Sequence, residues 1–236
     1  MPSKDKKKIL LSILIPIYNE EKTLKILLKK VNSINISKEI IVINDGSIDS
    51  SLKILNDNKN LFNYMISYKR NRGKGFACRK GILIAKGEYT IIQDADLEYN
   101  PENFINLLNE INNKNQVIYG SRVLTGGKII TPLGLRPYLS KFANLILTKI
   151  SNLLNNQNLT DAHTCYKLFK TEVLQNIKLK ENGFAFCPEI TAKISKLGIK
   201  IKEVPIDYNG RGYSEGKKIK FYHAIEAVIS LIRYNF

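Results

Sequence analysis

The sequence contains no tryptophan, only two histidines and only three cysteines. The cysteines, Cys78, Cys165 and Cys187, are odd in number and far apart, and none of them forms a CxxC pair. This pattern argues against a disulfide framework, and with His163 and His223 as the only histidines it also argues against a zinc site. We therefore expect reduced cysteines in a cytosolic compartment.

Long apolar runs are also missing. A membrane-spanning helix needs roughly 20 consecutive apolar residues, whereas the run after the charged segment Met1–Lys8 ends at Pro16. We expect neither a transmembrane helix nor a signal peptide. The predicted location is the cytoplasm, and peripheral contact with the cytoplasmic face of a membrane stays open.

Acidic residues are scarce relative to basic ones. The chain has 37 Lys and Arg against 21 Asp and Glu, a formal net charge of +16. Such a charge favours anionic partners: nucleic acid, nucleotides, phosphorylated lipids or an acidic membrane surface. Because the chain is also rich in lysine as part of a general Ile, Lys and Asn bias, the charge permits these partners without selecting one.

Strand and helix patterns alternate through the first half of the 236 residues. We expect strands at Ile9–Ile17, Glu39–Asn44, Tyr64–Ser67, Tyr89–Gln93 and Gln116–Tyr119. Between them, apolar residues recur at i, i+3, i+4 and i+7, the spacing of an amphipathic helix. Repeated strand–helix units with short loops predict an α/β fold with a mainly parallel central sheet flanked by helices.

The second half is less regular. We expect a helix over Leu135–Leu154, strands at Cys165–Phe169 and Ile199–Pro205, and a final helix with Ile219, Tyr222, Ile225, Ile229 and Ile232 on one face. No composition shift or linker marks a boundary, so a single domain is predicted over residues 1–236, with about 9–122 and about 123–236 as its two halves.

Two aspartates follow the fourth predicted strand, in the segment DADLEYNP. Residues two apart on an extended strand point to the same side, so Asp94 and Asp96 would aim their carboxylates into one volume. Two such charges repel unless a cation neutralises them, and a hard divalent ion prefers oxygen ligands. The alternative is that the aspartates only end a strand and cap a helix.

Other polar residues also fall at predicted strand ends, where α/β sheets bind ligands. They are Tyr18, Glu20, Asp45 and Arg122. Asp45 lies beside the strand of Tyr18 and Glu20, where its carboxylate could accept a nucleobase N–H. The alternative for Asp45-Gly46-Ser47 is a simple turn and helix cap.

Basic residues supply candidates for phosphate binding. Lys74 lies in Arg72-Gly73-Lys74-Gly75, a glycine-containing entry to a helix of the kind that cradles phosphate, although it lacks the P-loop pattern. Further candidates are Arg122, Arg136, Arg211, Lys217 and Lys218, each of which could instead be a solvated surface charge. We expect the glycine-flanked loop after Arg211 to be mobile. Glu189, at a predicted helix start, has a structural interpretation.

The order of these motifs resembles the family 2 glycosyltransferases, and within them the dolichyl- or polyprenyl-phosphate mannose or glucose synthases. The matching pieces are IPIYNEE, INDGSIDSS, NRGKGFACRKGI, DADLEYNP, GSR, TDAHTCYKLFK and EVPIDYNGRGYSEGKK. They span nearly the whole chain. The resemblance implies a GT-A fold, a nucleotide-sugar donor, Mg²⁺ or Mn²⁺, and inversion at the anomeric carbon.

The resemblance also implies roles for individual residues. Pro16, Tyr18, Glu20 and Asp45 match the nucleoside-binding positions, and Asp94-Ala95-Asp96 matches the DxD segment that holds the metal and the donor diphosphate. Glu98 would be a further metal contact. Arg122, Arg136, Arg211 and Lys217 or Lys218 would stabilise the diphosphate and the acceptor phosphate.

The predicted reaction moves a hexose from a UDP-glucose or GDP-mannose type of donor to a polyprenyl phosphate. An anionic acceptor phosphate needs positioning and basic groups rather than a strong base. If the acceptor were a sugar hydroxyl, a carboxylate base would be required, and Asp161 is the first candidate. The catalytic residues would then be Asp96, Arg122 and Asp161.

Two departures from the synthase pattern leave the donor and acceptor open. This chain has Thr164-Cys165-Tyr166-Lys167 where many such synthases have TSGFR, and the cations in GRGYSEGKK are spaced differently. A soluble family 2 enzyme acting on a saccharide or protein is therefore an alternative, and a basic nucleic-acid-binding protein is a distant one. The helix over Leu135–Leu154, the basic C-terminal helix and the basic N-terminus could hold the enzyme to an acidic membrane leaflet. Alternatively, both helices could simply pack on the sheet.

Overall fold

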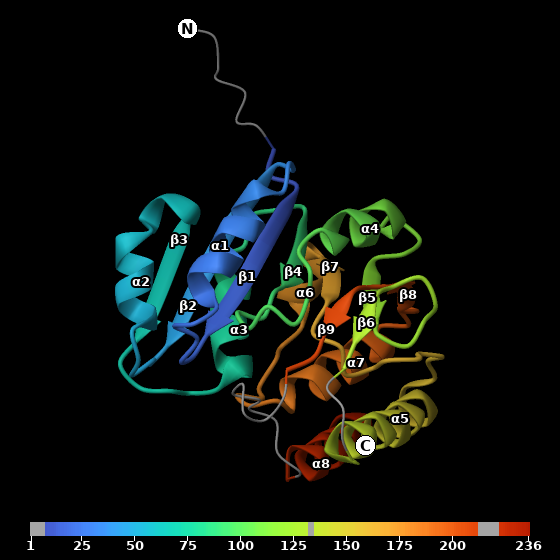
Figure 1. Cartoon of the computed structure of the whole chain (residues 1–236). Coiled ribbons are helices and arrows are strands. Elements are labelled where there is room, and N and C mark those ends of the chain that lie inside the picture. The colour runs from blue at the N-terminus through green and yellow to red at the C-terminus, as the bar shows by residue number, and fades with distance from the viewer. Residues whose placement is uncertain (1–7, 132–134, 212–221) are drawn as a thin grey trace, which may run out of the picture.

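A computed structural model describes residues 8–131, 135–211 and 222–236, and gives side chains for all of these except 135–138. Its centre is a seven-stranded sheet with the order β3-β2-β1-β4-β7-β5-β8 (Figure 1). The strands are β1 (Leu11–Ile17), β2 (Lys38–Asp45), β3 (Tyr64–Tyr68), β4 (Tyr89–Ile92), β5 (Val117–Ser121), β7 (Lys167–Lys170) and β8 (Lys202–Pro205).

Helices lie between the strands along the chain. They are α1 (Leu24–Ser33), α2 (Ser51–Asp57), a 3-10 turn η1 (Lys59–Leu61), α3 (Lys74–Ile84), α4 (Asn103–Glu110), α5 (Leu135–Asn155), α6 (Thr171–Asn176), α7 (Phe186–Lys196) and α8 (Tyr222–Asn235). Two short strands, β6 (Ile129–Ile130) and β9 (Tyr208–Asn209), pair in parallel as a small second sheet. The predicted α/β class is confirmed.

The sheet is mainly parallel, as the sequence predicts. β1 pairs in parallel with β2 and β4, β2 with β3, and β5 with β8. Only β7 runs the other way, and it joins β4 to β5. Because β7 comes from the second half of the chain, one continuous sheet spans both halves.

The core forms on both faces of the sheet. β1 reads LSILIPI and is buried along almost its whole length, which is typical of a central parallel strand covered by helices on both sides. On one side α3 packs closely on β1 and β2: a Cβ added at Gly81 would come within 3.0 Å of Leu14 and Ile43. The predicted stripe of α1 (Leu24, Leu27, Leu28, Val31) is fully buried.

Several predicted strand ends differ from the structure, as at β1, which begins at Leu11, and β8, which begins at Lys202; at β7 the physical reason is clear. The strand expected from Cys165 begins only at Lys167. The backbone N–H of Cys165 donates to the Tyr99 hydroxyl at 3.0 Å instead of to a neighbouring strand. Cys165 therefore belongs to the loop that faces the strand ends.

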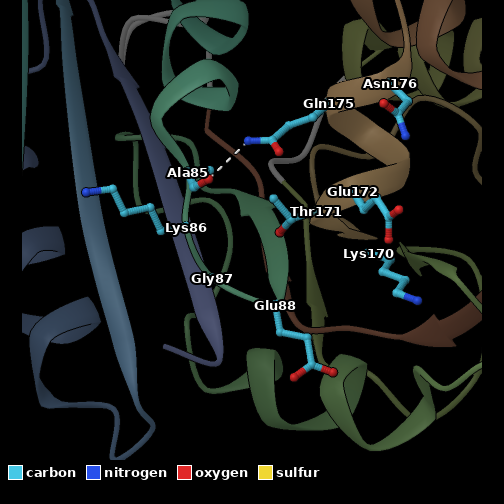
Figure 2. A pocket seen from close by; sticks show the side chains of 9 residues that line it. All are labelled: Ala85, Lys86, Gly87, Glu88, Lys170, Thr171, Glu172, Gln175 and Asn176. Atoms are coloured by element: carbon cyan, nitrogen blue, oxygen red, sulfur yellow. Dashed lines mark hydrogen bonds between the residues drawn. The ribbon is translucent and has the colours of Figure 1, made fainter. Parts of the chain in front are cut away.

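A shallow pocket lies near the amino end of β4, at the sheet edge away from the carboxyl ends of the parallel strands (Figure 2). It is lined by residues of the α3–β4 connection and by the start of α6, including Gly87 and Thr171. Gln175 crosses this region and donates to the Ala85 carbonyl at 3.0 Å, which fastens α6 to the end of α3. This pocket is remote from the strand ends that carry the predicted site.

Within the described ranges, no helix combines the length and the apolar character that crossing a bilayer requires. The longest, α5, has 21 residues and includes Lys141 and Lys149.

Candidate active site

The carboxyl ends of β1, β2 and β4 bring most of the predicted residues to one edge of the sheet. Parallel strands end at a common edge, so residues distant in sequence become neighbours. Glu20 follows β1, Asp45 ends β2, and Asp94 and Asp96 follow β4. Arg211, which follows β9, reaches into the same group of side chains.

The two aspartates do not lie on an extended strand. β4 ends at Ile92, and the chain then turns over residues 95–98, where Leu97 has a φ of 62°. A left-handed conformation is uncommon for a residue with a branched side chain, and such strain concentrates at functional sites. The turn is closed by the Glu98 N–H, which donates to Asp96 Oδ1 at 3.1 Å.

Asp94 pairs with the predicted phosphate ligand Lys74. Lys74 Nζ lies 2.5 Å from Asp94 Oδ1, and it also approaches the Cys165 sulfur at 3.5 Å. Burial alone would lower the pKa of Lys74, but the charge of Asp94 outweighs it and raises that pKa well above its usual value. The lysine is therefore a fixed cation at the start of α3.

Asp96 belongs to a second cluster, built around Arg211. The Arg211 guanidinium lies 2.9 Å from Asp96, 3.3 Å from Glu20 and 3.6 Å from Glu98. The Tyr208 hydroxyl and the Arg211 N–H both donate to Glu98, at 2.8 and 3.0 Å. One cation thus contacts three carboxylates, one that follows β1 and two that follow β4.

Burial and neighbouring negative charge act together on Asp96. Burial, together with the charges of Asp94 and Glu98, raises the pKa of Asp96 to about 7, despite the opposing charge of Arg211. Ionised Asp96 is thus under-neutralised in this structure. A further cation at this position would be electrostatically favourable.

Arg122 forms a separate ion pair with Asp161. The guanidinium donates two hydrogen bonds to the carboxylate, at 2.7 and 2.8 Å. The backbone N–H of Arg122 donates a third at 3.1 Å. Its guanidinium also lies 5.1 Å from the Tyr208 ring centroid, within cation–π range. Bidentate pairing of this kind fixes the orientation of an arginine.

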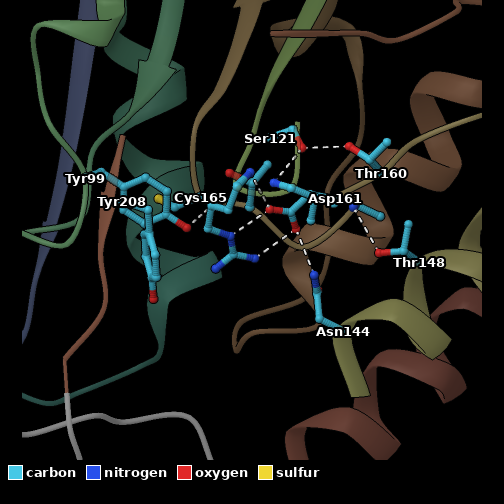
Figure 3. Close-up of polar contacts among 12 residues, drawn as sticks. Tyr99, Ser121, Asn144, Thr148, Thr160, Asp161, Cys165 and Tyr208 are labelled. Atoms are coloured by element: carbon cyan, nitrogen blue, oxygen red, sulfur yellow. Dashed lines mark hydrogen bonds and ion pairs between the residues drawn. The ribbon is translucent and has the colours of Figure 1, made fainter. Parts of the chain in front are cut away.

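Asp161 is completely buried and held from several sides (Figure 3). Asn144 on α5 donates to its carboxylate at 3.1 Å, and the Glu203 carboxylate accepts from the Asp161 N–H at 2.9 Å. Burial would raise the pKa of Asp161, but the charge and hydrogen bonds of Arg122 hold it well below its usual range. A base needs a free lone pair and access to its substrate, so this geometry favours a positioning role for Asp161.

The Asp45 carboxylate contacts the loop that precedes α3. Its carboxylate accepts the backbone N–H groups of Arg72 and Gly73, at 3.0 and 2.7 Å, and the residue is only 2% exposed. Gly73 has a φ of 102°, and an added Cβ would meet the Asn182 carbonyl oxygen at 2.4 Å. In this structure Asp45 anchors the loop that carries Lys74 rather than facing an open groove.

The remaining predicted residues are placed as follows. Pro16 lies in β1 opposite Ile43, and Tyr18 is half-buried just beyond the strand. Ala95 accepts a hydrogen bond from Thr23 through its carbonyl at 2.7 Å. Lys217, Lys218, the side chain of Arg136 and the loop after Arg211 lie outside the described residues.

Sequence reasoning did not single out Tyr208, Asn144 or Glu203. Tyr208 contacts both Glu98 and Arg122, so it connects the two ion-pair clusters. Asn144 belongs to a polar stripe on α5 that also contains Thr148, Ser151 and Asn155. That stripe has helical spacing, so its period was a signal that could have been found.

The carboxylates fit a hard divalent cation by their chemistry. Asp94, Asp96 and Glu98 offer oxygen ligands, and burial, with the charges of Asp94 and Glu98, raises the pKa of Asp96. No group of three Asp, Glu, His or Cys side chains within the described ranges forms a ready metal cage. A few carboxylates without a complete set of protein ligands are expected where phosphate oxygens of a bound substrate supply the other ligands of the cation.

Several solved structures share this fold. One is glucosyl-3-phosphoglycerate synthase from Mycobacterium tuberculosis, in complex with Mn²⁺, UDP and phosphoglyceric acid. It matches with a TM-score of 0.69 and 16% identity, over 96% of this chain and 78% of that one. The fold is of the GT-A type.

Curated relatives share more sequence. A dolichyl-phosphate beta-glucosyltransferase of Trichomonas vaginalis is 30% identical over 97% of this chain and 74% of its own length. The dolichol-phosphate mannosyltransferase of Pyrococcus furiosus is 28% identical over 87% of this chain and 58% of its own.

The parallel sheet with its strand-end cluster of charged residues defines an α/β protein with the GT-A type of fold. The sequence model of Glycosyl transferase family 2 matches residues 12–178, which is more than half of the chain. The chain therefore belongs to glycosyltransferase family 2 and is a glycosyltransferase.

His163, next to the Arg122–Asp161 pair, predicts acid sensitivity. Burial, with the nearby charge of Lys167, lowers the pKa of His163 from 6.5 to about 4. Its Nε2 has no hydrogen-bond partner among the described residues. As the pH falls below 6.5, His163 binds a proton in the unfolded chain but stays neutral in the folded protein. The free energy of unfolding therefore declines until about pH 4.

We expect acidification from pH 7 to pH 5 to cost about 2 kcal/mol of unfolding free energy through His163 alone. Urea titrations of the unaltered protein and His163→Gln at both pH values measure this, and the variant should lose correspondingly less. His223→Gln is the matched control. Equal pH dependence in the unaltered protein and His163→Gln would contradict the prediction.

Proposed function

We propose that this enzyme transfers a hexose, with inversion, from a nucleoside diphosphate sugar to a polyprenyl phosphate such as dolichyl phosphate. The observation that carries the proposal is the under-neutralised Asp96 beside Asp94, at the carboxyl edge of the sheet and flanked by Lys74 and Arg211. This combination suits a metal-bound diphosphate. The acceptor class is supported by the dolichyl-phosphate glucosyl- and dolichol-phosphate mannosyltransferases that the chain resembles.

The donor would lie along the ends of β1, β2 and β4. Asp94 and Asp96, with Glu98 as a further oxygen donor, would hold Mg²⁺ or Mn²⁺; when bound, the cation neutralises the charge of the departing diphosphate. Lys74 would contact the same diphosphate. Asp45 would act indirectly, by fixing the loop that positions Lys74, while Pro16, Tyr18 and Glu20 would flank the nucleoside.

Arg211 has two roles in this proposal. Its guanidinium shares one positive charge among the carboxylates of Glu20, Asp96 and Glu98. When the donor binds, we expect it to turn toward the phosphates, since a cation at Asp96 and Asp94 competes with it for the same carboxylate oxygens. Lys217, Lys218 and Arg136 stay candidates for the same task.

The acceptor phosphate would be bound beside Arg122. The Asp161 carboxylate, Asn144 and Tyr208 hold this guanidinium in place, so its outer edge is pre-oriented at little entropic cost. A phosphate oxygen is already anionic, so it attacks without a base. Apart from Arg122 and Arg211, residues of about 9–122 would thus serve the donor, and those of about 123–236 the acceptor.

Partition of the product between solvents tests this proposal. Labelled UDP-glucose and GDP-mannose are incubated separately with the enzyme, Mn²⁺ or Mg²⁺, and detergent-dispersed dolichyl phosphate. We expect label in the organic phase with one donor and none after chelation of the metal with EDTA. UDP-glucose is the first choice, since the solved relative binds UDP-glucose with Mn²⁺. Label appearing only on a water-soluble saccharide or protein would refute the lipid acceptor.

A further inference from the structure

The segment that carries the predicted cation ligands is attached at both ends to a single loop. We call residues 94–98 the acidic segment; its carboxylates are those of Asp94, Asp96 and Glu98. Gln93 precedes this segment, Tyr99 follows it, and both side chains are buried. Each of them hydrogen-bonds to the loop that enters β7, at two consecutive residues, Cys165 and Tyr166. The two ends of the acidic segment therefore have a common support from the second half of the chain.

The first end is fixed by two side-chain hydrogen bonds in series. The Tyr166 hydroxyl donates to Gln93 Oε1 at 2.5 Å, and Gln93 Nε2 donates to the Asp94 carbonyl at 2.9 Å. The Gln93 backbone N–H also donates to the Leu14 carbonyl of β1 at 2.9 Å. Gln93 thus fixes the direction in which the chain leaves the sheet at Asp94.

Tyr166 is itself held in place from several sides. Its side chain is fully buried, and its ring packs against those of Tyr99 and Phe104, at centroid distances of 4.8 and 5.6 Å. Its carbonyl accepts from the Gly120 N–H at 2.8 Å, and a Cβ added at Gly120 would come within 3.1 Å of the Tyr166 Cβ. Such a close approach to a strand is a place that favours glycine. A hydroxyl on a side chain with so little freedom can fix the amide to which it donates.

The second end is held through Tyr99. Its hydroxyl accepts from the Cys165 N–H at 3.0 Å (Figure 3). Its ring packs edge-to-face against that of Tyr208, whose hydroxyl donates to Glu98 at 2.8 Å. Tyr99 therefore supports the last carboxylate of the acidic segment as well as the backbone that follows it.

These contacts oppose two forces within the acidic segment. The charges of Asp94 and Glu98 act unfavourably on ionised Asp96, and Leu97 has a left-handed backbone conformation. Both effects favour a more open arrangement of the segment when no ligand is bound. Unfavourable conformations persist where the surrounding structure fixes them from several sides. Buried hydrogen bonds at both ends of the segment meet that requirement.

We propose that Gln93, Tyr99 and Tyr166 are positioning residues that clamp the acidic segment, so that its carboxylates are set for a divalent cation and a diphosphate before either binds. None of the three would touch the cation; each acts through the acidic segment. Outer contacts of this type orient the groups that bind a metal, and their loss commonly weakens metal binding about 10- to 100-fold. This role rests on the proposed function, in which Asp94 and Asp96 are cation ligands.

Calorimetric titration with a nucleoside diphosphate tests the clamp. The probe is UDP or GDP, whichever binds the unaltered protein more tightly with Mn²⁺, and each protein is also titrated in EDTA. Tyr166→Phe removes only the hydroxyl that donates to Gln93. We expect it to bind the probe about tenfold more weakly with Mn²⁺ and almost unchanged in EDTA, because the carboxylates contribute only through the cation. Tyr99→Phe should show the same pattern.

Tyr119→Phe is the matched control. Tyr119 is also fully buried, and its hydroxyl forms a hydrogen bond of 3.0 Å with Thr191 of α7 rather than with the acidic segment. The control should lower the melting temperature, as the loss of a buried hydrogen bond does. It should keep the Mn²⁺-dependent affinity of the unaltered protein.

A double variant separates positioning from stability. Tyr166→Phe leaves Gln93 Oε1 buried without its donor, whereas Gln93→Met/Tyr166→Phe replaces both partners by apolar groups of similar shape, which can be nearly neutral. The double variant should recover its melting temperature and still bind about tenfold more weakly with Mn²⁺, because no amide then holds the Asp94 carbonyl. If circular dichroism shows that Tyr166→Phe does not fold, the double variant takes its place.

The outcomes distinguish the clamp from the proposed function. If Tyr166→Phe binds the probe like the unaltered protein, or loses affinity equally with Mn²⁺ and in EDTA, the clamp is refuted and the proposed function stands. An equal loss in Tyr119→Phe, or full Mn²⁺-dependent affinity in a stable double variant, has the same meaning. An unaltered protein that binds neither UDP nor GDP more tightly with Mn²⁺ than in EDTA would refute the metal-bound donor site, and the clamp with it.

Discussion

Replacing Asp96 with asparagine is expected to stabilise the ligand-free protein while removing most of its activity. The pKa of Asp96 is raised to about 7 by burial and by the charges of Asp94 and Glu98. The sign follows from linkage: above pH 7 the folded protein must ionise a carboxyl that ionises more easily in the unfolded chain, so the charge opposes folding. As the pH falls from about 7 toward 3.8, the folded state keeps its proton and the cost shrinks; it is gone once the unfolded chain is protonated as well.

The melting temperature of Asp96→Asn should therefore exceed that of the unaltered protein at pH 8 by about 3 °C or more, equivalent to about 1 kcal/mol. At pH 5 the two melting temperatures should approach each other. Metal-dependent transfer should fall about 10²- to 10³-fold, the usual loss when one group that stabilises transition-state charge is removed.

A binding measurement makes this prediction independent of the assay. Mn²⁺ with UDP should raise the melting temperature of the unaltered protein, because a ligand that binds only the folded state stabilises it. In Asp96→Asn this increase should be largely lost. Asp57→Asn, the same change at an exposed end of α2, is the control and should alter neither property. Full metal-dependent transfer by Asp96→Asn would contradict the proposed role.

Replacing Asp161 with asparagine is expected to destabilise the protein strongly. The carboxylate is fully buried and provides both oxygens to Arg122. Removing one partner of a buried ion pair leaves an uncompensated charge and typically costs about 3 to 5 kcal/mol. For a chain of this length the melting temperature should fall by about 10 °C.

A double-mutant cycle distinguishes the interaction energy of the Arg122–Asp161 pair from the separate effect of each residue. Arg122→Gln should also destabilise, but the double variant Arg122→Gln/Asp161→Asn should recover part of the loss, since no buried charge is then left alone. The coupling energy should reach about 2 kcal/mol in a double-mutant cycle. Additive losses would contradict a direct interaction.

The same variants decide between two roles for Asp161. If Asp161 were a general base, the transfer rate would fall at low pH as its carboxylate became protonated, and Asp161→Asn would remove that fall. Because Arg122 holds the pKa of Asp161 well below its usual range, we expect no Asp161-dependent change in the rate profile between about pH 5 and 8. Arg122→Gln should lower the rate about 10²-fold, mainly through weaker use of the acceptor.

Much of the fold could be read from local pattern. The buried run of β1 and the stripe of α1 are properties of adjacent residues, and both appear where expected. The same holds for the placement of Glu20, Asp45 and Asp94 after their strands, because parallel strands that end at one edge bring their following residues together.

The pairing of the site residues could not be read in this way. That Lys74 faces Asp94, and that Arg211 faces Glu20, Asp96 and Glu98, depends on how segments far apart in the sequence are oriented. The expectation that Asp94 and Asp96 share one direction failed to anticipate the turn at Leu97, which gives each aspartate its own cation.

The amino-acid sequence by itself determined the alternation of strands and helices, the position of the acidic turn, and the excess of basic charge of the whole chain. Those features depend on side-chain period and composition, which are local. Only the tertiary structure decided that Asp161 is buried under Arg122, that Asp45 holds a loop, and that α5 turns its polar side inward. An amphipathic helix has two faces, and which one is buried depends on whether the neighbouring elements offer hydrogen bonds or apolar surface.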